Sequence, residues 1–191
     1  MFEKRVRSVH PDIERIVFSQ DQIHQRVSEL GAALSAEYAT PESRGAGVEL
    51  VCVLKGAATF MSDLARAMTI PLEMDYMAVS SYGTGTTSSG VVTFQKDLSS
   101  DITGKHVIIA EDVIDTGLTL QRLLQVLAAR NPASLEVVPL LRKDVPGQAD
   151  IDCKMVGFEC PNDFIVGYGL DYAERYRNLP YIGVLKPEAY Q

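Results

Sequence analysis

The sequence predicts an α/β fold in which helices cover both faces of a twisted, mostly parallel central sheet. Residues 48–54 and 107–110 are short apolar runs rich in β-branched residues, which is typical of strands buried on both sides. Each run leads through a turn into apolar residues at helical spacing, the order of a parallel strand and helix unit. The chain has 191 residues, and we expect one domain over residues 1–191.

The composition is that of a soluble globular protein, with 46% hydrophobic and 23% charged residues. No apolar run approaches the roughly twenty residues of a membrane span, and no secretory signal opens the chain, so we expect a cytoplasmic protein without membrane partners. A net charge of -7 disfavours nucleic acid as a partner, because neutralising phosphates takes clustered Lys and Arg. Cys52, Cys153 and Cys160 lack metal-type spacing, and we expect them to be reduced and structural.

The stretch from residue 107 to residue 127 carries the most chemistry. Its apolar start predicts a buried strand, and its end predicts a helix with leucines at helical spacing. The loop between them should lie at the carboxyl edge of the sheet, where ligands bind in such folds. The amides that open the helix suit a phosphate, Thr116 and Thr119 add hydroxyl donors, and Gly117 lets the backbone wrap closely.

Three carboxylates, of Glu111, Asp112 and Asp115, stand directly before this phosphate cradle. They would repel an anion unless a partner lies between. Carboxylates accept hydrogen bonds from the paired hydroxyls of a ribose, and Mg²⁺ usually binds through one or two carboxylates together with substrate phosphates. The loop therefore predicts a sugar phosphate that carries vicinal hydroxyls, with Mg²⁺ as the cofactor.

Three other interpretations fit this loop less well. Acidic residues and a Gly-containing turn are common in solvated loops, but the full pattern is more specific than Asp-Thr-Gly alone. An aspartic protease needs two such carboxylates that share a proton, whereas the chain has one copy followed by an amphipathic helix. A calcium loop needs alternate ligands and a bidentate Glu at the twelfth position, and neither is present.

The N-terminal third predicts an edge strand at residues 13–18, then a helix with a capping box of Ser19 and Gln22. Residues 38–47 predict a surface loop, and residues 48–54 the first central strand. A turn of Lys55 and Gly56 follows, which supplies a cation and open amides of the kind that a diphosphate needs, and then a helix that contains Phe60 and Leu64.

After a strand at residues 72–80, residues 81–92 are small, polar and rich in glycine, and we expect them to form a mobile lid. The segment lacks the spacing of a dinucleotide fingerprint and the ending of a Walker loop. Arg142, Lys143 and Asp144 follow a later strand and are candidates for the site, because they should reach the carboxyl edge. Further strands are predicted at residues 91–95, 135–141, 155–158, 164–168 and 181–185.

The polar positions from Glu111 to Thr119 all match the phosphoribosyl diphosphate signature of the type I phosphoribosyltransferases. From about residue 13 to residue 185 the chain resembles the purine class of this family that acts on hypoxanthine and guanine. The other landmarks, in family order, are Leu54-Lys55-Gly56, Ser81-Tyr82, Lys143, the run Phe-x-Val-Gly-Tyr-x-Leu-Asp-Tyr that begins at Phe164, and Arg177.

The resemblance implies the type I phosphoribosyltransferase fold, with a core at about residues 20–150 and a small hood from about residues 1–20 and 150–191. It also implies purine salvage: transfer of 5-phosphoribose from 5-phospho-α-D-ribose 1-diphosphate to N9 of hypoxanthine or guanine, which gives IMP or GMP and diphosphate. Members of the family are dimers or tetramers, so a homodimer or homotetramer is expected.

The resemblance also implies residue roles. Asp115 is the catalytic residue and exchanges a proton with N7 of the purine. Glu111 and Asp112 bind the ribose hydroxyls, directly or through Mg²⁺, and Asp171 supports a second Mg²⁺ through water. The full set expected to bind phosphoribosyl diphosphate is Lys55, Gly56, Ser81, Tyr82, Glu111, Asp112, Asp115, Thr116, Gly117, Leu118, Thr119 and Arg177.

For the purine, the resemblance implies that Lys143 donates to the 6-oxo group, which selects against adenine. Phe164 stacks on the base, and backbone groups of Ile165 and Asp171 read its other edge. Two alternatives stay open. One is a xanthine-preferring enzyme, and the other is a regulator of the same fold that binds nucleic acid, which the acidic charge disfavours.

Overall fold

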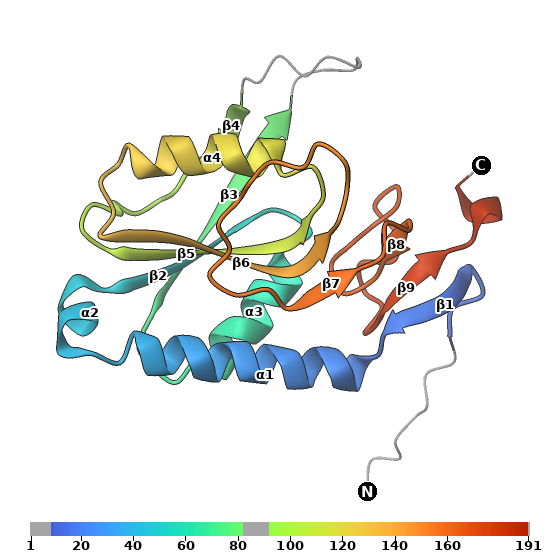
Figure 1. Ribbon diagram of the computed structural model, residues 1–191, viewed down its shortest axis with the longest axis horizontal. Coiled ribbons are helices and arrows are strands. Elements are labelled where there is room, and N and C mark those ends of the chain that lie inside the picture. Colours follow the sequence, from blue (N-terminus) through green and yellow to red (C-terminus); the bar gives the residue numbers. More distant parts are fainter. Residues whose placement is uncertain (1–8, 82–91, 191) are drawn as a thin grey trace, which may run out of the picture.

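The structure is a computed structural model that describes residues 9–81 and 92–190 (Figure 1). Its centre is a six-stranded sheet with the order β4-β3-β2-β5-β6-β7. All neighbours pair in parallel except β3 and β4, so the predicted mostly parallel sheet is confirmed. The strands are β2 (Val48–Val53), β3 (Glu73–Ser81), β4 (Val92–Lys96), β5 (His106–Ile114), β6 (Ser134–Lys143) and β7 (Phe158–Cys160).

Helices lie on both faces of this sheet, as predicted. Helices α1 (Gln20–Glu37) and α3 (Ala58–Ala67) pack against each other on one face, and α4 (Leu118–Ala128) covers the other (Figure 1). The predicted capping box is confirmed, because the Ser19 side chain accepts from the Gln22 amide and the Gln22 side chain accepts from the Ser19 amide. None of the described helices is both long enough and apolar enough to span a membrane.

The two central strands supply apolar side chains to a core on each face. Successive residues of a strand point to opposite sides, so a segment covered on both faces favours apolar residues at consecutive positions. In β5, Ile108 packs in the core beneath α1 and α3, whereas Ile109 packs in the core beneath α4. Both side chains are fully buried. This is the physical reason for the continuous apolar run in the sequence.

A separate three-stranded antiparallel sheet lies beyond β7 and joins segments from both ends of the chain (Figure 1). Its order is β1-β9-β8, and Ile13, Val166, Tyr181 and Leu185 form a small core around it. The strands are β1 (Ile13–Phe18), β8 (Ile165–Val166) and β9 (Ile182–Leu185), and a short 3-10 turn, η1 (Pro187–Ala189), follows. The predicted strands at 13–18 and 181–185 are thus confirmed, the second one residue shorter.

Two local predictions are wrong. The expected loop at residues 38–47 contains a short helix, α2 (Pro41–Ala46), which Thr40 caps by accepting from the Ser43 amide and in which Pro41 takes the first turn. The expected strand at residues 155–158 begins only at Phe158. The segment before Phe158 bonds to β6 without regular strand pairing. The amides of Lys154 and Gly157 are three residues apart, but the β6 carbonyls to which they donate are only two residues apart.

The predicted lid at residues 81–92 falls almost wholly on residues 82–91, which lie outside the described residues, and Tyr82 lies there too. Ser81 ends β3, and β4 matches the predicted return strand within one residue at each end. The strand that carries Lys143 is longer than predicted, because β6 extends through Arg142 and Lys143.

Candidate active site

The parallel strands bring the predicted site residues to one edge of the central sheet. Glu111 and Asp112 lie near the carboxyl end of β5, Lys143 is the last residue of β6, and Lys55 follows β2 after Leu54. The peptide bond between Leu54 and Lys55 is cis. In open α/β sheets this edge is where ligands bind.

The predicted phosphate cradle and two of the predicted carboxylates, Glu111 and Asp115, line a single hollow. Gly117 begins α4 in the left-handed conformation with φ 71°, and no side chain caps the helix. Its opening amides, including that of Leu118, are therefore available to an anion. A cavity of about 170 Å³ lies here, and its lining is Glu111, Val113, Ile114, Asp115, Thr116, Gly117, Thr119 and Leu120.

Glu111 is an acceptor without a partner. Its Oε2 atom is out of contact with solvent and has no hydrogen-bond partner among the described residues. Burial, together with the neighbouring Asp112, raises the pKa of Glu111 well above its ordinary value. A buried carboxylate without a donor is costly, so this position suits a ligand that brings hydroxyl groups or a cation.

Asp112 turns away from that hollow, towards Gly56. A Cβ added to Gly56 would lie 1.6 Å from Asp112 Oδ2, so the carboxylate packs directly on the glycine backbone. Burial raises the pKa of Asp112, against the lowering effects of the Val113 amide, which donates to Oδ1, and of the Arg177 charge. Glu111 and Asp112 thus point to different parts of the site, which the sequence motif does not reveal.

The two predicted diphosphate cations meet at one carboxylate. Lys55 Nζ lies 3.0 Å from Glu174 Oε2, and Arg177 Nη2 lies 3.4 Å from Glu174 Oε1. Arg177 also pairs with Asp171 Oδ1 at 2.8 Å and donates to the Gly169 carbonyl at 2.8 Å, while its buried Nε has no partner among the described residues. The site therefore holds a buried donor as well as a buried acceptor without partners.

The residues expected to bind the purine lie at the end of β6 (Lys143), at or just before the start of β8 (Phe164 and Ile165) and in the segment after β8 (Asp171). Lys143 Nζ donates to the Asp163 carbonyl at 3.1 Å, beside Phe164, which is 42% exposed. Tyr190 stacks on Phe164, with 5.0 Å between ring centroids and 28° between planes. Ile165 is buried in β8. Tyr190 could not be predicted from the sequence, because a single aromatic residue near a terminus has no pattern.

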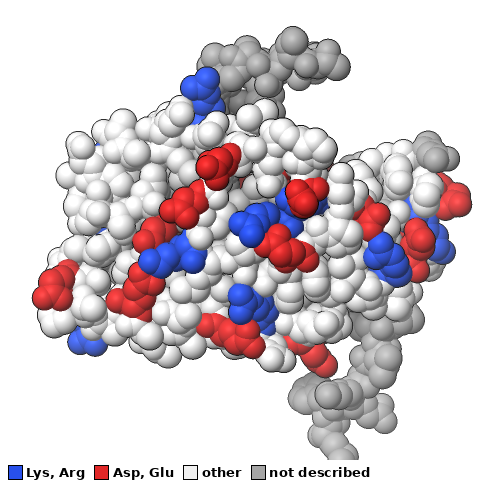
Figure 2. Space-filling model, in the orientation of Figure 1, with Lys and Arg blue, Asp and Glu red and all other residues white. Residues whose placement is uncertain are grey.

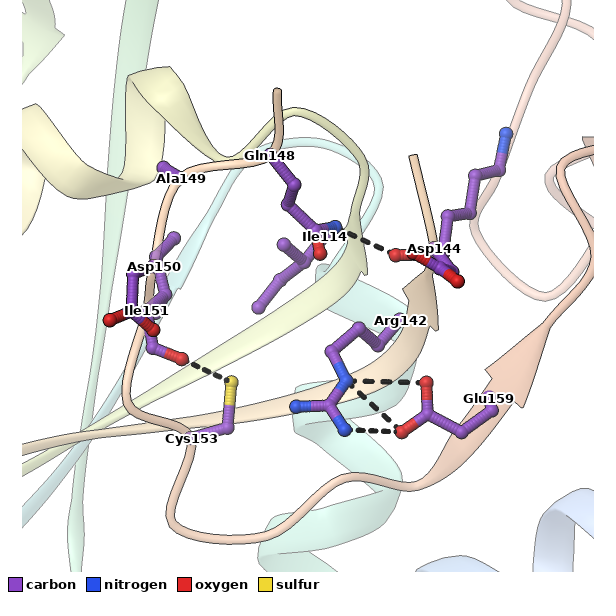
Figure 3. Close-up of a pocket in the computed structure, with 10 residues that line it drawn as sticks. Ile114, Arg142, Asp144, Gln148, Ala149, Asp150, Ile151, Cys153 and Glu159 are labelled. Carbon is purple, nitrogen blue, oxygen red and sulfur yellow. Dashed lines mark hydrogen bonds and ion pairs between the residues drawn. The ribbon is translucent and has the colours of Figure 1, made fainter. Parts of the chain in front are cut away.

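Gln148 is a second residue that the sequence did not single out. Its Nε2 donates to the Asp115 carbonyl at 2.6 Å and to the Lys143 carbonyl at 2.7 Å. It lies beside a larger cavity of about 480 Å³ (Figure 3). Arg142 also lines that cavity, but its guanidinium pairs with both carboxylate oxygens of Glu159, so this cation is already neutralised.

The described residues alone do not form a complete metal-binding site. Among residues 9–81 and 92–190, no group of three or more His, Cys, Asp or Glu is arranged to hold a metal ion. Mg²⁺ commonly binds through one or two carboxylates and completes its shell with substrate phosphates and water. The unpartnered Glu111 oxygen and the buried Asp112 fit such an ion when a phosphorylated ligand supplies the remaining oxygens.

A stability measurement tests the cost of the Glu111 charge. Because its pKa is raised by folding, its favourable contribution is present below the ordinary value of 4.5 and is lost as pH rises towards the higher folded value. Glu111→Gln removes this loss, so we expect the ligand-free variant to melt about 2–4 °C higher near neutral pH, the shift for roughly 1 kcal/mol in a chain of this size.

The control is Glu29→Gln on α1, where bonds from Arg26 and Gln25 lower the pKa of Glu29. This variant should gain nothing near neutral pH. Melting curves of both variants across pH should show the Glu111→Gln advantage disappear in acid. If the melting temperature of Glu111→Gln exceeds that of the wild type equally at every pH, or at none, folding does not penalise the charge of Glu111.

The chain is similar to known proteins over nearly its whole length. A model of the phosphoribosyl transferase domain matches residues 19–173. The hypoxanthine-guanine phosphoribosyltransferase of Mycobacterium avium is 51% identical over 181 residues, which span 94% of this chain and 89% of that protein.

Two solved structures are similar in fold as well as in sequence. A hypoxanthine phosphoribosyltransferase from Staphylococcus aureus has a TM-score of 0.90 at 46% identity and covers 97% of this chain and 99% of its own. The enzyme of Trypanosoma cruzi in complex with the product IMP has a TM-score of 0.89 at 38% identity, over 96% of this chain and 100% of its own.

Proposed function

The chain belongs to the family of phosphoribosyl transferase domains, and on that premise we propose how its site works. Its activity is that of the hypoxanthine-guanine class, which makes IMP or GMP and diphosphate in purine salvage. One structural observation supports the residue assignment most strongly: the hollow that places the free Glu111 carboxylate opposite Thr116, Gly117 and Thr119. A ribose 5-phosphate has the two matching ends, hydroxyls and a phosphate.

In the proposed complex, the 5′-phosphate lies against the opening amides of α4 and accepts from the hydroxyls of Thr116 and Thr119. Glu111 accepts from the ribose hydroxyls, which satisfies its buried oxygen. Glu111 or Asp112, together with diphosphate oxygens, would hold Mg²⁺, which would supply positive charge at the leaving group. Asp171 would support a second Mg²⁺ through water.

The diphosphate takes the place of a protein carboxylate. Glu174 now neutralises both Lys55 and Arg177, and its pKa is lowered chiefly by its bond to Lys55. We expect the diphosphate oxygens to displace Glu174 and to accept from these two cations and from the Gly56 amide. Lys55 is 67% exposed, so its side chain is free to follow the leaving group.

The purine lies between Lys143 and Asp115. Lys143 has three N–H donors, and one that does not bond to the Asp163 carbonyl is available to the 6-oxo group. Phe164 offers an exposed ring on which the base stacks. Backbone groups of Ile165 and Asp171 bind the other edge of the base. Asp115, in the turn between β5 and α4, exchanges a proton with N7 while N9 bonds to C1′.

The function is tested by measuring diphosphate release with phosphoribosyl diphosphate, Mg²⁺ and each purine in turn. Release with hypoxanthine and guanine, and little with adenine, is expected. Faster release with xanthine would favour the xanthine-preferring alternative. Release with none of the purines would contradict the proposed site.

A nucleic acid-binding regulator is not favoured by the surface. On the face shown in Figure 2, Lys and Arg alternate with Asp and Glu and do not gather into a basic patch. The net charge is -7. We expect no retention of RNA or DNA in a filter-binding measurement at moderate salt. We also propose a homodimer or homotetramer in the cytoplasm, and light scattering of the purified chain gives its mass.

Lys143→Met tests the assignment of the 6-oxo donor. A hydrogen bond to a charged group is worth about 1.5–3 kcal/mol, so kcat/KM for hypoxanthine should fall roughly 10- to 150-fold. The KM for phosphoribosyl diphosphate should stay near the wild-type value. The ratio of kcat/KM for hypoxanthine to kcat/KM for adenine should decrease. Arg44→Met, which removes a cation on α2, is the control. An unchanged preference over adenine would contradict the role of Lys143.

A further inference from the structure

Gln148 bridges the two strand ends that carry the reacting partners. Both of its bonds run to main-chain carbonyls, that of Asp115 at 2.6 Å and that of Lys143 at 2.7 Å. A carbonyl can only accept, so the amide nitrogen, with its two hydrogens, must face both. The neighbouring amide of Ala149 donates to the Thr116 carbonyl at 2.8 Å, which ties the same segment to the phosphate cradle.

The position of this bridge in the sheet explains its effect. Strands β5 and β6 pair in parallel, and the last pair of their register is Ile114 with Arg142. Asp115 and Lys143 are the next residues along, where β5 turns into the cradle and the ladder stops. Gln148 inserts its amide at this point and bonds to both strand ends, so it takes the place of the next ladder bond.

We propose that Gln148 is a positioning residue that fixes the phosphoribose loop relative to the purine-binding end of β6. The inference rests on the proposed function, in which Asp115 and the cradle hold one substrate and Lys143 holds the other. Bond formation needs C1′ and N9 in line, and a displacement of about 1 Å can cost about 10²-fold in rate. The side chain itself needs no contact with either substrate.

Loss of this bridge should lower kcat more than it weakens binding. Each substrate keeps its own contacts in Gln148→Ala, so both KM values should change little, while kcat falls roughly 10- to 100-fold because the two substrates are held in poorer alignment. A purely structural role would instead lower the melting temperature and raise both KM values together. Initial rates over a grid of both substrates separate the two cases.

Two further variants separate alignment from folding. Gln148→Glu keeps the length but replaces the donors with acceptors that repel both carbonyls, so it should lose at least as much kcat as Gln148→Ala. Gln148→Lys has three N–H donors at similar reach and should recover most of kcat. Gln25→Ala should match the wild type, because the exposed side chain of Gln25 on α1 bonds, among the described residues, only to Glu29.

The outcomes distinguish this inference from the function on which it rests. A wild-type chain that releases no diphosphate overturns the proposed function and the inference together. If the wild type is active and Gln148→Ala has the same kcat, the inference alone is overturned. The same holds if kcat of Gln148→Lys is no higher than kcat of Gln148→Glu. If near-UV circular dichroism shows that Gln148→Ala fails to fold, the comparison of kcat between Gln148→Glu and Gln148→Lys still tests the inference.

Discussion

Replacing Asp115 with Asn should lower kcat for transfer to hypoxanthine by about 10²- to 10⁴-fold, the usual contribution of a general acid or base. Asn has the same size and keeps the loop, but it cannot take up or release a proton. Asp115 lies in the turn between β5 and α4, lines the hollow with Thr116 and Thr119, and is exposed to a ligand there. Binding of phosphoribosyl diphosphate should therefore be retained.

The measurement is a set of initial rates with both substrates varied, together with a direct titration of phosphoribosyl diphosphate. Asp152→Asn, at an exposed aspartate outside the hollow, controls for the loss of one negative charge. An Asp115→Asn variant that turns over at the wild-type rate would remove Asp115 from proton transfer. A variant that loses binding and kcat equally would make Asp115 a binding residue.

Gly56→Ala should nearly abolish activity, because there is no room for a methyl group. The new Cβ would lie 1.6 Å from Asp112 Oδ2 and 2.8 Å from its Cγ, so the carboxylate or the loop must move. The loop cannot retreat freely, since the Gly56 carbonyl is itself packed against Gly169, where a Cβ would lie 2.1 Å away. We expect kcat/KM for phosphoribosyl diphosphate to fall by about 10²-fold or more.

The chain offers a matched control for this change. Gly45, in α2, has nothing within 4 Å of an added Cβ, so Gly45→Ala should leave activity intact. Both variants change glycine to alanine and differ only in what surrounds the methyl group. Full affinity for phosphoribosyl diphosphate in Gly56→Ala would show that Asp112 and this turn lie outside the binding site.

Periodic and capped elements were predictable from the sequence because their causes are local. The capping box at Ser19 and Gln22 satisfies helix amides through residues three apart, and residues 107–110 of β5 are all apolar because both faces of that segment are covered. The parallel topology then brings the ends of β2, β5 and β6 together, which explains why the motif residues gather at one edge.

Features that depend on three-dimensional neighbours could not be predicted in this way. The motif treats Glu111 and Asp112 alike, but the strand points one to the cradle and the other to Gly56. Gln148 acquires its position only because β6 ends opposite Asp115, and Tyr190 only because the chain end returns to Phe164. Helix α2 is different, since Thr40 and Pro41 gave a local start signal that the glycines around residue 45 obscured.

The most direct measurement is a crystal structure of the chain with bound IMP. The phosphate should accept from the amides of residues 116–119 and from the hydroxyls of Thr116 and Thr119, with the ribose hydroxyls at Glu111 and the 6-oxo group at Lys143. A phosphate found instead in the larger cavity beside Arg142 and Glu159, with the hollow between Glu111 and Thr116 empty, would contradict the assignment of this site.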